Sequence, residues 1–181
     1  MQIHSILIAS LIFAGGCKKH GNDTAQAASA AAPKTTEPAA SACPAGAYTD
    51  KDHGFCVQLG AGWKLTNSEP RGNYVMTEFG IDKYDSRITV TTYPKNDTTY
   101  DSELESKKGL GNPTSPGEKK IADGDLPGGV GYFYEIDMGN DIDQGETVVK
   151  NPKGSPVECY VNKGSDKFKD AMEACKTLRP L

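Results

Sequence analysis

The sequence predicts an α+β domain in which an antiparallel β-sheet has flanking helices and a C-terminal helix packs on the sheet. Several short segments alternate apolar and polar residues with a period of two. Gly, Pro, Asn and Asp separate these segments, which is the pattern of strands joined by turns. The segment 166–178 differs, because its apolar residues recur at three- and four-residue spacing and so form one face of a helix. Those residues are Phe168, Ala171, Met172, Cys175 and Leu178.

The other elements follow from the same two periods. The first strand is expected at 54–59, where every second residue is apolar. A helix is expected at 98–108, with Asp97 or Thr98 as its N-terminal cap. Residues 132–134 make both faces of their strand apolar, so the sheet is expected to be covered on both sides. The remaining strands are expected at 73–79, 87–93, 118–122, 130–138, 146–150 and 157–161.

Residues 1–16 are expected to be a secretory signal peptide. An apolar run at 6–13 is too short to span a membrane and ends in Ala-Gly-Gly before Cys17. This junction resembles the lipobox of bacterial lipoproteins, so we expect Cys17 to be lipidated and to become the first residue of the mature chain. The charges depart from the usual pattern, because no Lys or Arg precedes the apolar run and two lysines follow the cysteine. The alternative is a short apolar element of a cytoplasmic protein.

Residues 17–42 are expected to be the lipidated cysteine and a flexible tether. After Cys17 this segment contains no Val, Ile, Leu, Met or aromatic residue, so it cannot bury enough apolar surface to offset its ordering entropy. One α+β domain is then expected at 43–181. The whole chain carries a formal charge of −4, and residues 17–42 contribute +1 of it, so the domain carries −5. This acidic balance argues against a nucleic-acid partner.

The four cysteines after Cys17 are expected to form two disulfides, as an even number does in exported domains. Three pairings are possible. Cys159 and Cys175 lie on neighbouring apolar faces of the last strand and the last helix, so we favour the pairing Cys159–Cys175. Cys43–Cys56 then follows by elimination. A zinc site is not expected, because the domain has no Cys-x-x-Cys pair and only one histidine.

A search for catalytic motifs is negative, and no cofactor is expected. His53 is the one imidazole of the domain, and its place in a polar turn indicates a solvated residue rather than a general base. The most polar cluster is 137–146, whose oxygen-bearing side chains are weak candidates for calcium ligands. Their spacing does not match an EF-hand loop, so an acidic hairpin turn is favoured. The candidates are Asp137, Asp141, Asp143 and Glu146.

A short motif carries one family resemblance. Gly54-Phe55-x-Val57-x-Leu59-x-x-Gly62-Trp63 is similar to the opening segment of the PsbP-like superfamily. That group includes the photosystem II extrinsic subunit, the Ran-binding Mog proteins and several small bacterial lipoproteins. Gly60 stands where the family often has Pro, and the resemblance covers about 49–181. It implies an antiparallel sheet ending in a helix and a non-enzymatic domain that binds or assists another protein, and it transfers no functional residue.

Together these observations predict a membrane-anchored envelope lipoprotein whose domain is a protein-binding or accessory module, such as an immunity or inhibitor protein. Lys18 directly after Cys17 favours outer-membrane sorting under enterobacterial rules, with the domain facing the periplasm or the cell surface. The expected partners are therefore the membrane, through the lipid, and a protein of unknown identity. The alternative is a lipoprotein that binds calcium or a small ligand at 137–146, and a hydrolase is the least favoured function.

Overall fold

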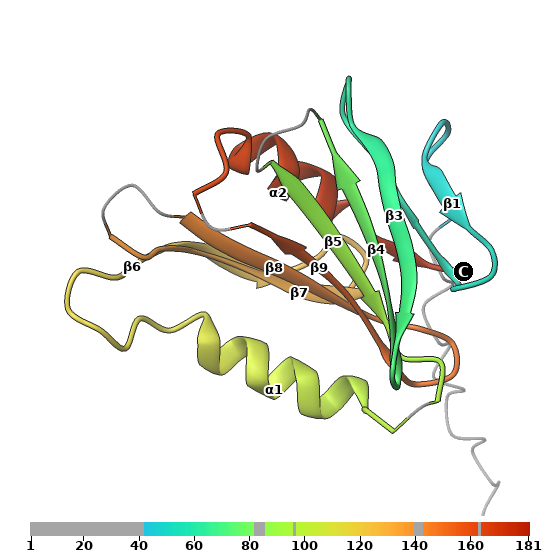
Figure 1. Ribbon diagram of the computed structural model, residues 1–181. Coiled ribbons are helices and arrows are strands. Elements are labelled where there is room, and N and C mark those ends of the chain that lie inside the picture. The colour runs from blue at the N-terminus through green and yellow to red at the C-terminus, as the bar shows by residue number, and fades with distance from the viewer. Residues whose placement is uncertain (1–41, 82–85, 96, 140–142, 163) are drawn as a thin grey trace, which may run out of the picture. The chain divides into compact units, whose positions relative to one another are not determined.

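Figure 1 shows a computed structural model of the protein, which describes residues 42–81, 86–95, 97–139, 143–162 and 164–181. The predicted signal peptide at 1–16, Cys17 and the predicted tether up to residue 41 lie outside the described residues, as does Asp141. Those predictions therefore stay predictions.

Seven antiparallel strands form the main sheet of the domain, in the order β3-β4-β5-β9-β8-β7-β6. This sheet and two helices confirm the α+β class expected from the sequence. The strands are β3 (Lys64–Arg71), β4 (Tyr74–Gly80), β5 (Arg87–Thr92), β6 (Lys119–Asp125), β7 (Gly131–Asp137), β8 (Asp143–Lys150) and β9 (Pro156–Val161).

A second, three-stranded sheet has the order β1-β2-β10 and is also antiparallel. It consists of β1 (Tyr48–Asp50), β2 (Phe55–Val57) and β10 (Arg179–Pro180), so it joins the two ends of the domain. Tyr48 of β1 packs edge-on against Phe79 of β4 with ring centroids 4.9 Å apart, and this contact links the small sheet to the main one. Strand β2 corresponds to the strand expected at 54–59 and is shorter than that range.

The main core lies between one face of the seven-stranded sheet and α2 (Phe168–Lys176). Ile88 and Val90 of β5 and Val157 and Val161 of β9 point to this face and are fully buried, as their period-two spacing predicts. Every residue of the predicted helical stripe in 166–178 is buried against them. Trp63 belongs to the same core, as expected.

Both expected disulfides are present. Cys159 of β9 pairs with Cys175 of α2, and Cys43 pairs with Cys56 of β2. These are the two pairings that the sequence favours. The first attaches α2 to the sheet within the core, since both of its cysteines are fully buried, and the second attaches the start of the domain to the small sheet.

Helix α1 (Tyr100–Leu110) packs on the opposite face of the sheet, over β7, β8 and β9. Tyr100 and Leu104 contact a small apolar cluster that includes Tyr134 and Val148. Phe133, the neighbour of Tyr134 in β7, packs into the main core on the other side. Both faces of β7, β8 and β9 are therefore covered, so the expectation drawn from 132–134 holds for this half of the sheet and not for β3, β4 and β5. The helix cap is Thr99 rather than Asp97 or Thr98, because the Thr99 side chain accepts a hydrogen bond from the Ser102 amide.

The sequence patterns miss three strands, and β3 is the longest of them. It forms an edge of the main sheet, and none of its eight residues is buried. An exposed edge strand has no apolar face, so period-two patterning cannot reveal it. Its position is set instead by the hairpin with β4, whose turn contains Gly72 at a φ of 68°, and by a bulge between Leu65 and Asn67. The other two, β1 and β10, are too short to show any period.

Candidate functional site

The face of the main sheet that carries α1 is only half covered. Helix α1 lies over β7, β8 and β9, whereas no helix or strand among the described residues lies over β3, β4 and β5 on this side (Figure 1). We call this uncovered part, with the adjoining end of β9, the open face. Its central residues are Tyr74, Met76, Glu78, Thr89, Thr91, Tyr93 and Tyr160, all half-buried.

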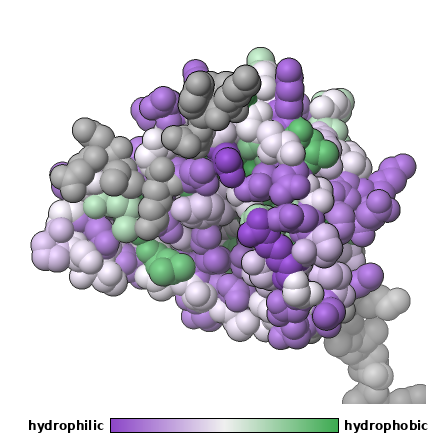
Figure 2. Space-filling view, viewed as in Figure 1, coloured by the Kyte–Doolittle hydropathy of each residue, from purple (hydrophilic) through white to green (hydrophobic). Residues whose placement is uncertain are grey.

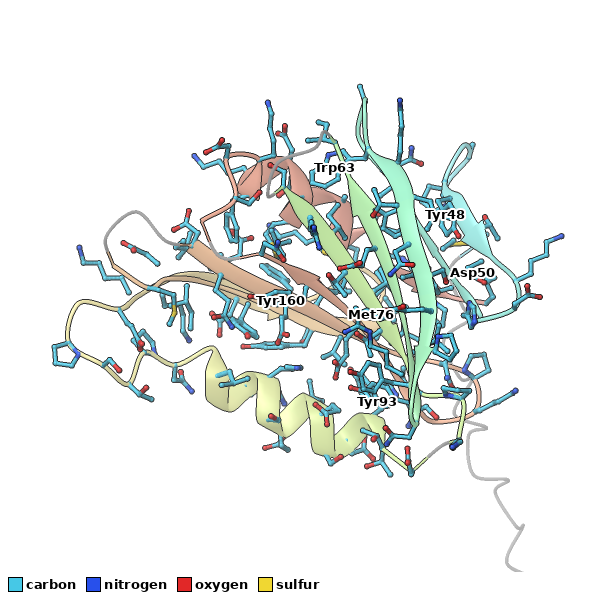
Figure 3. All side chains as sticks on the ribbon, viewed as in Figure 1. Tyr48, Asp50, Trp63, Met76, Tyr93 and Tyr160 are labelled. Atoms are coloured by element: carbon cyan, nitrogen blue, oxygen red, sulfur yellow. A yellow bond between two sulfur atoms is a disulfide. The ribbon has the colours of Figure 1, made fainter. Side chains whose placement is uncertain are left out.

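The register of the strands places these side chains in rows across the sheet. Thr89 of β5 lies between Tyr160 of β9 and Glu78 of β4. Thr91 lies between Glu158 and Met76 in the next row, because successive residues of one face are two apart in each strand. Figure 3 shows Tyr160, Met76 and Tyr93 on the side of the sheet that faces α1.

Aromatic side chains and Met76 give the open face an amphipathic surface. The rings of Tyr74 and Tyr93 are tilted by 50° with centroids 6.3 Å apart, so they form one continuous aromatic area at the end of β4 and β5. Charged pairs lie at both ends of the open face: Arg71 pairs with Glu69 beside Tyr74, and Arg87 Nη1 lies 3.5 Å from Glu78 Oε1 at the other end. Figure 2 shows the molecule in the same view as Figure 1, and the surface seen there is mostly hydrophilic, with a few hydrophobic residues among the hydrophilic ones.

A buried group of charges lies where the open face meets α1, and we call it the lysine–carboxylate cluster. Lys107 of α1 places its Nζ 3.0 Å from Glu146 Oε2 of β8, 3.7 Å from Glu158 Oε1 of β9 and 3.9 Å from Glu103 Oε2 of α1. The side chains of Lys107 and Glu158 are each 10% exposed, and that of Glu103 is 25% exposed. Three carboxylates thus share one ammonium in a region largely closed to water.

Hydroxyl groups connect the cluster to the strands around it. Tyr134 donates a hydrogen bond of 2.9 Å to Glu146 Oε2 and accepts one of 3.2 Å from the Gln144 amide. Tyr93 donates a hydrogen bond of 3.3 Å to Glu158 Oε2, which joins the cluster directly to the open face. The other oxygen of Glu158 is buried and has no hydrogen-bond partner among the described residues.

The surroundings change the proton affinities of the cluster. Burial raises the pKa of Glu158 to about 7; Lys107 opposes this rise, while Glu146 and Glu103 add to it. Burial alone would lower the pKa of Lys107, but Glu146 and Glu158 outweigh that effect and raise it. Burial also raises the pKa of Tyr93, with a further rise from Glu158. Lys107 is therefore charged and the tyrosine neutral near pH 7, whereas Glu158 exchanges its proton in that range.

Three of the four acidic residues predicted as weak calcium ligands lie within the described residues, and these three do not gather at one point. Asp137 and Asp143 face each other at the end of the β7–β8 hairpin, but Glu146 pairs with Tyr134 further along the strands and binds Lys107 instead. Strand β8 carries the Glu146 side chain toward α1, away from Asp137 and Asp143. The calcium site at 137–146 stays a prediction. Asp137 Oδ1 accepts a 2.7 Å hydrogen bond from the Gly139 amide, as in an Asx turn. Within the described parts of the chain, no three His, Cys, Asp or Glu side chains could hold a metal.

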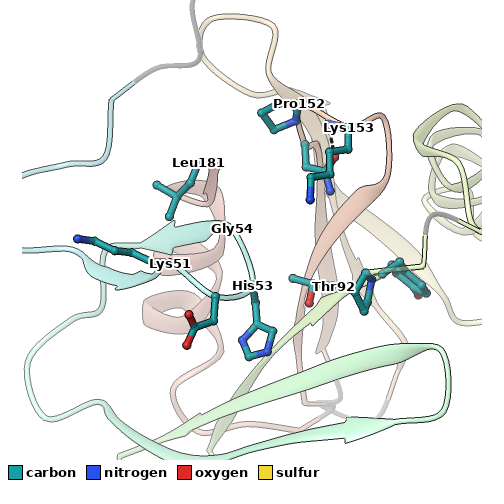
Figure 4. Close-up of a pocket in the computed structure, with 11 residues that line it drawn as sticks. Lys51, His53, Gly54, Thr92, Pro152, Lys153 and Leu181 are labelled. Atoms are coloured by element: carbon teal, nitrogen blue, oxygen red, sulfur yellow. Dashed lines mark hydrogen bonds between the residues drawn. The ribbon is translucent and has the colours of Figure 1, made fainter.

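His53 is held in its turn rather than freely solvated. Its Nδ1 lies 2.9 Å from Asp50 Oδ2, and its backbone amide donates a 2.9 Å hydrogen bond to Asp50 Oδ1. The ring lines a cavity of about 410 Å³ between the β1–β2 turn, the end of β5 and the β8–β9 turn (Figure 4). Two exposed lysines, Lys51 and Lys153, line the same cavity. The sequence contains one signal for the Asp50–His53 contact: the aspartate lies three residues before the histidine, which is a common spacing in turns.

Comparison with known proteins adds no assignment: no protein-family model and no curated protein matches this chain. Among the helices that the structure describes, none is long and apolar enough to cross a membrane. The open face and the lysine–carboxylate cluster beside it therefore form the candidate site on geometry alone. Sequence analysis missed this site, because its residues come from α1 and from four separate strands.

Proposed function

We propose that this chain is an envelope lipoprotein, anchored through lipid on Cys17, whose 43–181 domain binds another protein through the open face. The supporting observation is the half-covered sheet face itself, with three tyrosines and Met76 and with a charged pair at each end. Aromatic residues and Met are enriched in protein interfaces, where the ring is buried and the hydroxyl keeps a polar partner. The resemblance to PsbP-like domains, with their non-enzymatic binding roles, is part of the same proposal.

The partner that we propose is a protein surface with basic side chains. The domain carries a formal charge of −5, counted from the sequence. At the inner edge of the open face, the lysine–carboxylate cluster has two more carboxylates than ammonium groups. Opposite charge on a partner would accelerate association and fix its orientation, while the tyrosines would provide most of the buried contact area. An immunity or inhibitor protein acting on a basic toxin is one member of this class.

We propose binding rather than catalysis because the acidic groups of the site are already engaged. Glu146 is bound by Lys107 and Tyr134, and Glu158 is bound by Lys107 and Tyr93. A general acid or base must reach a substrate with its own oxygen or nitrogen. In this arrangement the surface presents hydroxyl groups and aromatic rings, which suit recognition.

A photo-crosslinking amino acid at Thr91 is expected to capture one protein in intact cells, because Thr91 lies at the centre of the open face. The same group at Lys169, an exposed residue of α2 on the other side of the sheet, is the control and should not capture it. Adding Met76→Arg to the Thr91 variant should reduce the yield about tenfold or more, since a central contact is worth about 2 kcal/mol or more. Equal capture from Thr91 and Lys169, or capture unaffected by Met76→Arg, would refute the proposed surface.

Substitution of the proposed anchor is a separate test. Cys17→Ser is expected to abolish incorporation of radioactive palmitate, because the thiol that receives the diacylglycerol is absent. The matched control is the double variant Cys43→Ala/Cys56→Ala, which loses two other cysteines and should remain labelled. Labelling that persists in Cys17→Ser would show that the anchor is elsewhere, and it would leave the binding surface untouched as a hypothesis.

A further inference from the structure

We infer that the lysine–carboxylate cluster is a pH-sensitive contact between α1 and the sheet. One proton on its carboxyl groups stabilises the packing of α1 on the sheet, and loss of that proton destabilises this packing. This inference rests on the packing of α1 and is independent of the proposed function. It concerns the cluster as a whole, since groups from several elements interact with Lys107, with its glutamates or with the tyrosines bound to them. They are Glu103 of α1, Tyr134 of β7, Gln144 and Glu146 of β8, Glu158 and Tyr160 of β9, and Tyr93 after β5.

The charges within the cluster do not balance when every acid is ionised. Glu146 lies closest to the ammonium of Lys107, at 3.0 Å, and receives a further hydrogen bond from Tyr134. The carboxylates of Glu158 and Glu103 lie farther from the Lys107 ammonium, at 3.7 and 3.9 Å, so each is attracted to it more weakly. The two carboxylates also repel each other when both are ionised. One added proton on this pair would remove a negative charge and would supply a donor for the Glu158 oxygen that has no hydrogen-bond partner among the described residues.

Helix α1 buries fewer residues against the sheet than α2 does. Lys107 is the one buried residue of α1, and the apolar contacts of the helix come from the partly buried Tyr100 and Leu104. Helix α2 buries five residues and is held by the disulfide at Cys175. A helix with few buried apolar contacts opens at low free energy, so a change in charge beneath α1 acts mainly on α1.

The direction of the pH effect follows from the proton affinity of Glu158. Its pKa in the folded state, about 7, lies above the ordinary value of 4.5, so the packed helix binds the proton more tightly than the open form does. The added stability is complete below about pH 4.5 and is lost as the pH rises through about 7. The cluster therefore holds most of this proton at pH 6 and little of it at pH 8. Because Tyr93 donates to Glu158, the change also reaches the open face.

Amide hydrogen exchange at several pH values tests the inference on the intact domain. After correction for the intrinsic exchange rate, protection of the α1 amides is expected to fall about tenfold between pH 6 and pH 8. The amides of β5 and β9 in the core should keep their protection. Constant protection of α1, or an equal loss in α1 and the core strands, would overturn the inference.

Two substitutions separate the cluster from general effects of charge. Glu158→Gln keeps the side chain neutral at every pH, so protection of α1 should become independent of pH. Glu135→Gln is the matched control, because Glu135 is also buried but binds Lys176, at 2.6 Å, on the other face of the sheet. This variant should keep the tenfold change in α1. A pH dependence that survives in Glu158→Gln, or that disappears in Glu135→Gln, would contradict the assignment to this cluster.

A direct titration makes the test independent of helix opening. In protein labelled with ¹³C at glutamate carboxyl groups, one resonance is expected to titrate with a midpoint near pH 7, and it should be missing in Glu158→Gln. If no glutamate titrates above pH 6, the cluster holds no proton near neutrality and the inference fails.

Discussion

Replacing Lys107 with methionine is expected to lower the free energy of unfolding by about 3–5 kcal/mol at pH 8, measured by urea denaturation. The substitution keeps an unbranched side chain that is one atom shorter, and it removes the ammonium that Glu103, Glu146 and Glu158 share. Carboxylates buried without a cation either lose solvation at full cost or take up protons, and at pH 8 neither outcome is favourable.

The cost of the Lys107→Met substitution should be smaller at pH 5.5 than at pH 8. Lys107 lowers the pKa of Glu158, so its removal raises that pKa further and lets protons replace the lost charge at mildly acidic pH. A cost that is equal at both pH values would indicate that the cluster contributes through packing alone.

Lys108 is a matched control for this experiment, because it follows Lys107 in the same helix. Its side chain is 47% exposed and pairs with Glu105, which is 77% exposed. Pairs of this kind contribute little, so Lys108→Met should change the free energy of unfolding by about 0.5 kcal/mol or less. Similar losses from the two substitutions would contradict the special role given to the buried cluster.

Removing the Cys159–Cys175 disulfide, as Cys159→Ala/Cys175→Ala, is expected to cost about 3 kcal/mol in the same assay. The crosslink spans a sequence separation of 16 residues and so restricts the unfolded chain. Both sulfur atoms also lie in the core between β9 and α2, so alanine leaves unfilled space there. A reducing agent should lower the stability of the wild type by breaking this disulfide. It should have no such effect on the variant, which lacks the disulfide.

The second disulfide provides the comparison for the first. Cys43–Cys56 spans a similar separation of 13 residues, so its effect on the unfolded chain is nearly the same. Cys43 is only half-buried, and alanine there leaves less unfilled space. Cys43→Ala/Cys56→Ala should therefore cost less than the α2 pair. A larger cost would show that attachment of the small sheet matters more to the domain than the attachment of α2.

Elements with one buried face were predictable from the sequence. In β5 the buried residues Ile88 and Val90 alternate with the half-buried Thr89 and Thr91, and this pattern alone predicts a strand. The helical stripe of α2 was equally clear. The same faces place Cys159 and Cys175 within reach of each other, so the sequence also favoured their pairing.

Elements without an apolar face were not predictable in this way. Strand β3 is a strand because its backbone pairs with β4 at the edge of the sheet, and its polar side chains have no period to detect. The boundaries of β8 were also misplaced, since its first residues, including Asp143, suggested a turn by composition. Backbone hydrogen bonds to β7 continue through them.

The residues of the candidate site were also only partly predictable from the sequence. Glu103 and Lys107, four residues apart, would pass for an ordinary surface pair in a polar helix. Period-two alternation puts Glu158 on the face opposite Cys159, but it does not say what covers that face. Glu146 is expected from the sequence both as the last residue of the polar cluster 137–146 and as the first residue of a strand, and neither expectation places it beneath a helix. Only the packing of α1 over β8 and β9 brings these groups together and closes them from water.

The sequence by itself determined which segments bury an apolar face, which cysteines lie on those faces and, as a prediction, where the anchor and tether lie. Local periodicity is enough for that, because each strand or helix shows its buried side through its own residues. The tertiary structure alone decided which half of the α1 side of the sheet stays open and which charges are buried beneath the helix. Burial and charge balance depend on contacts between residues far apart in the chain, and no local pattern records those contacts.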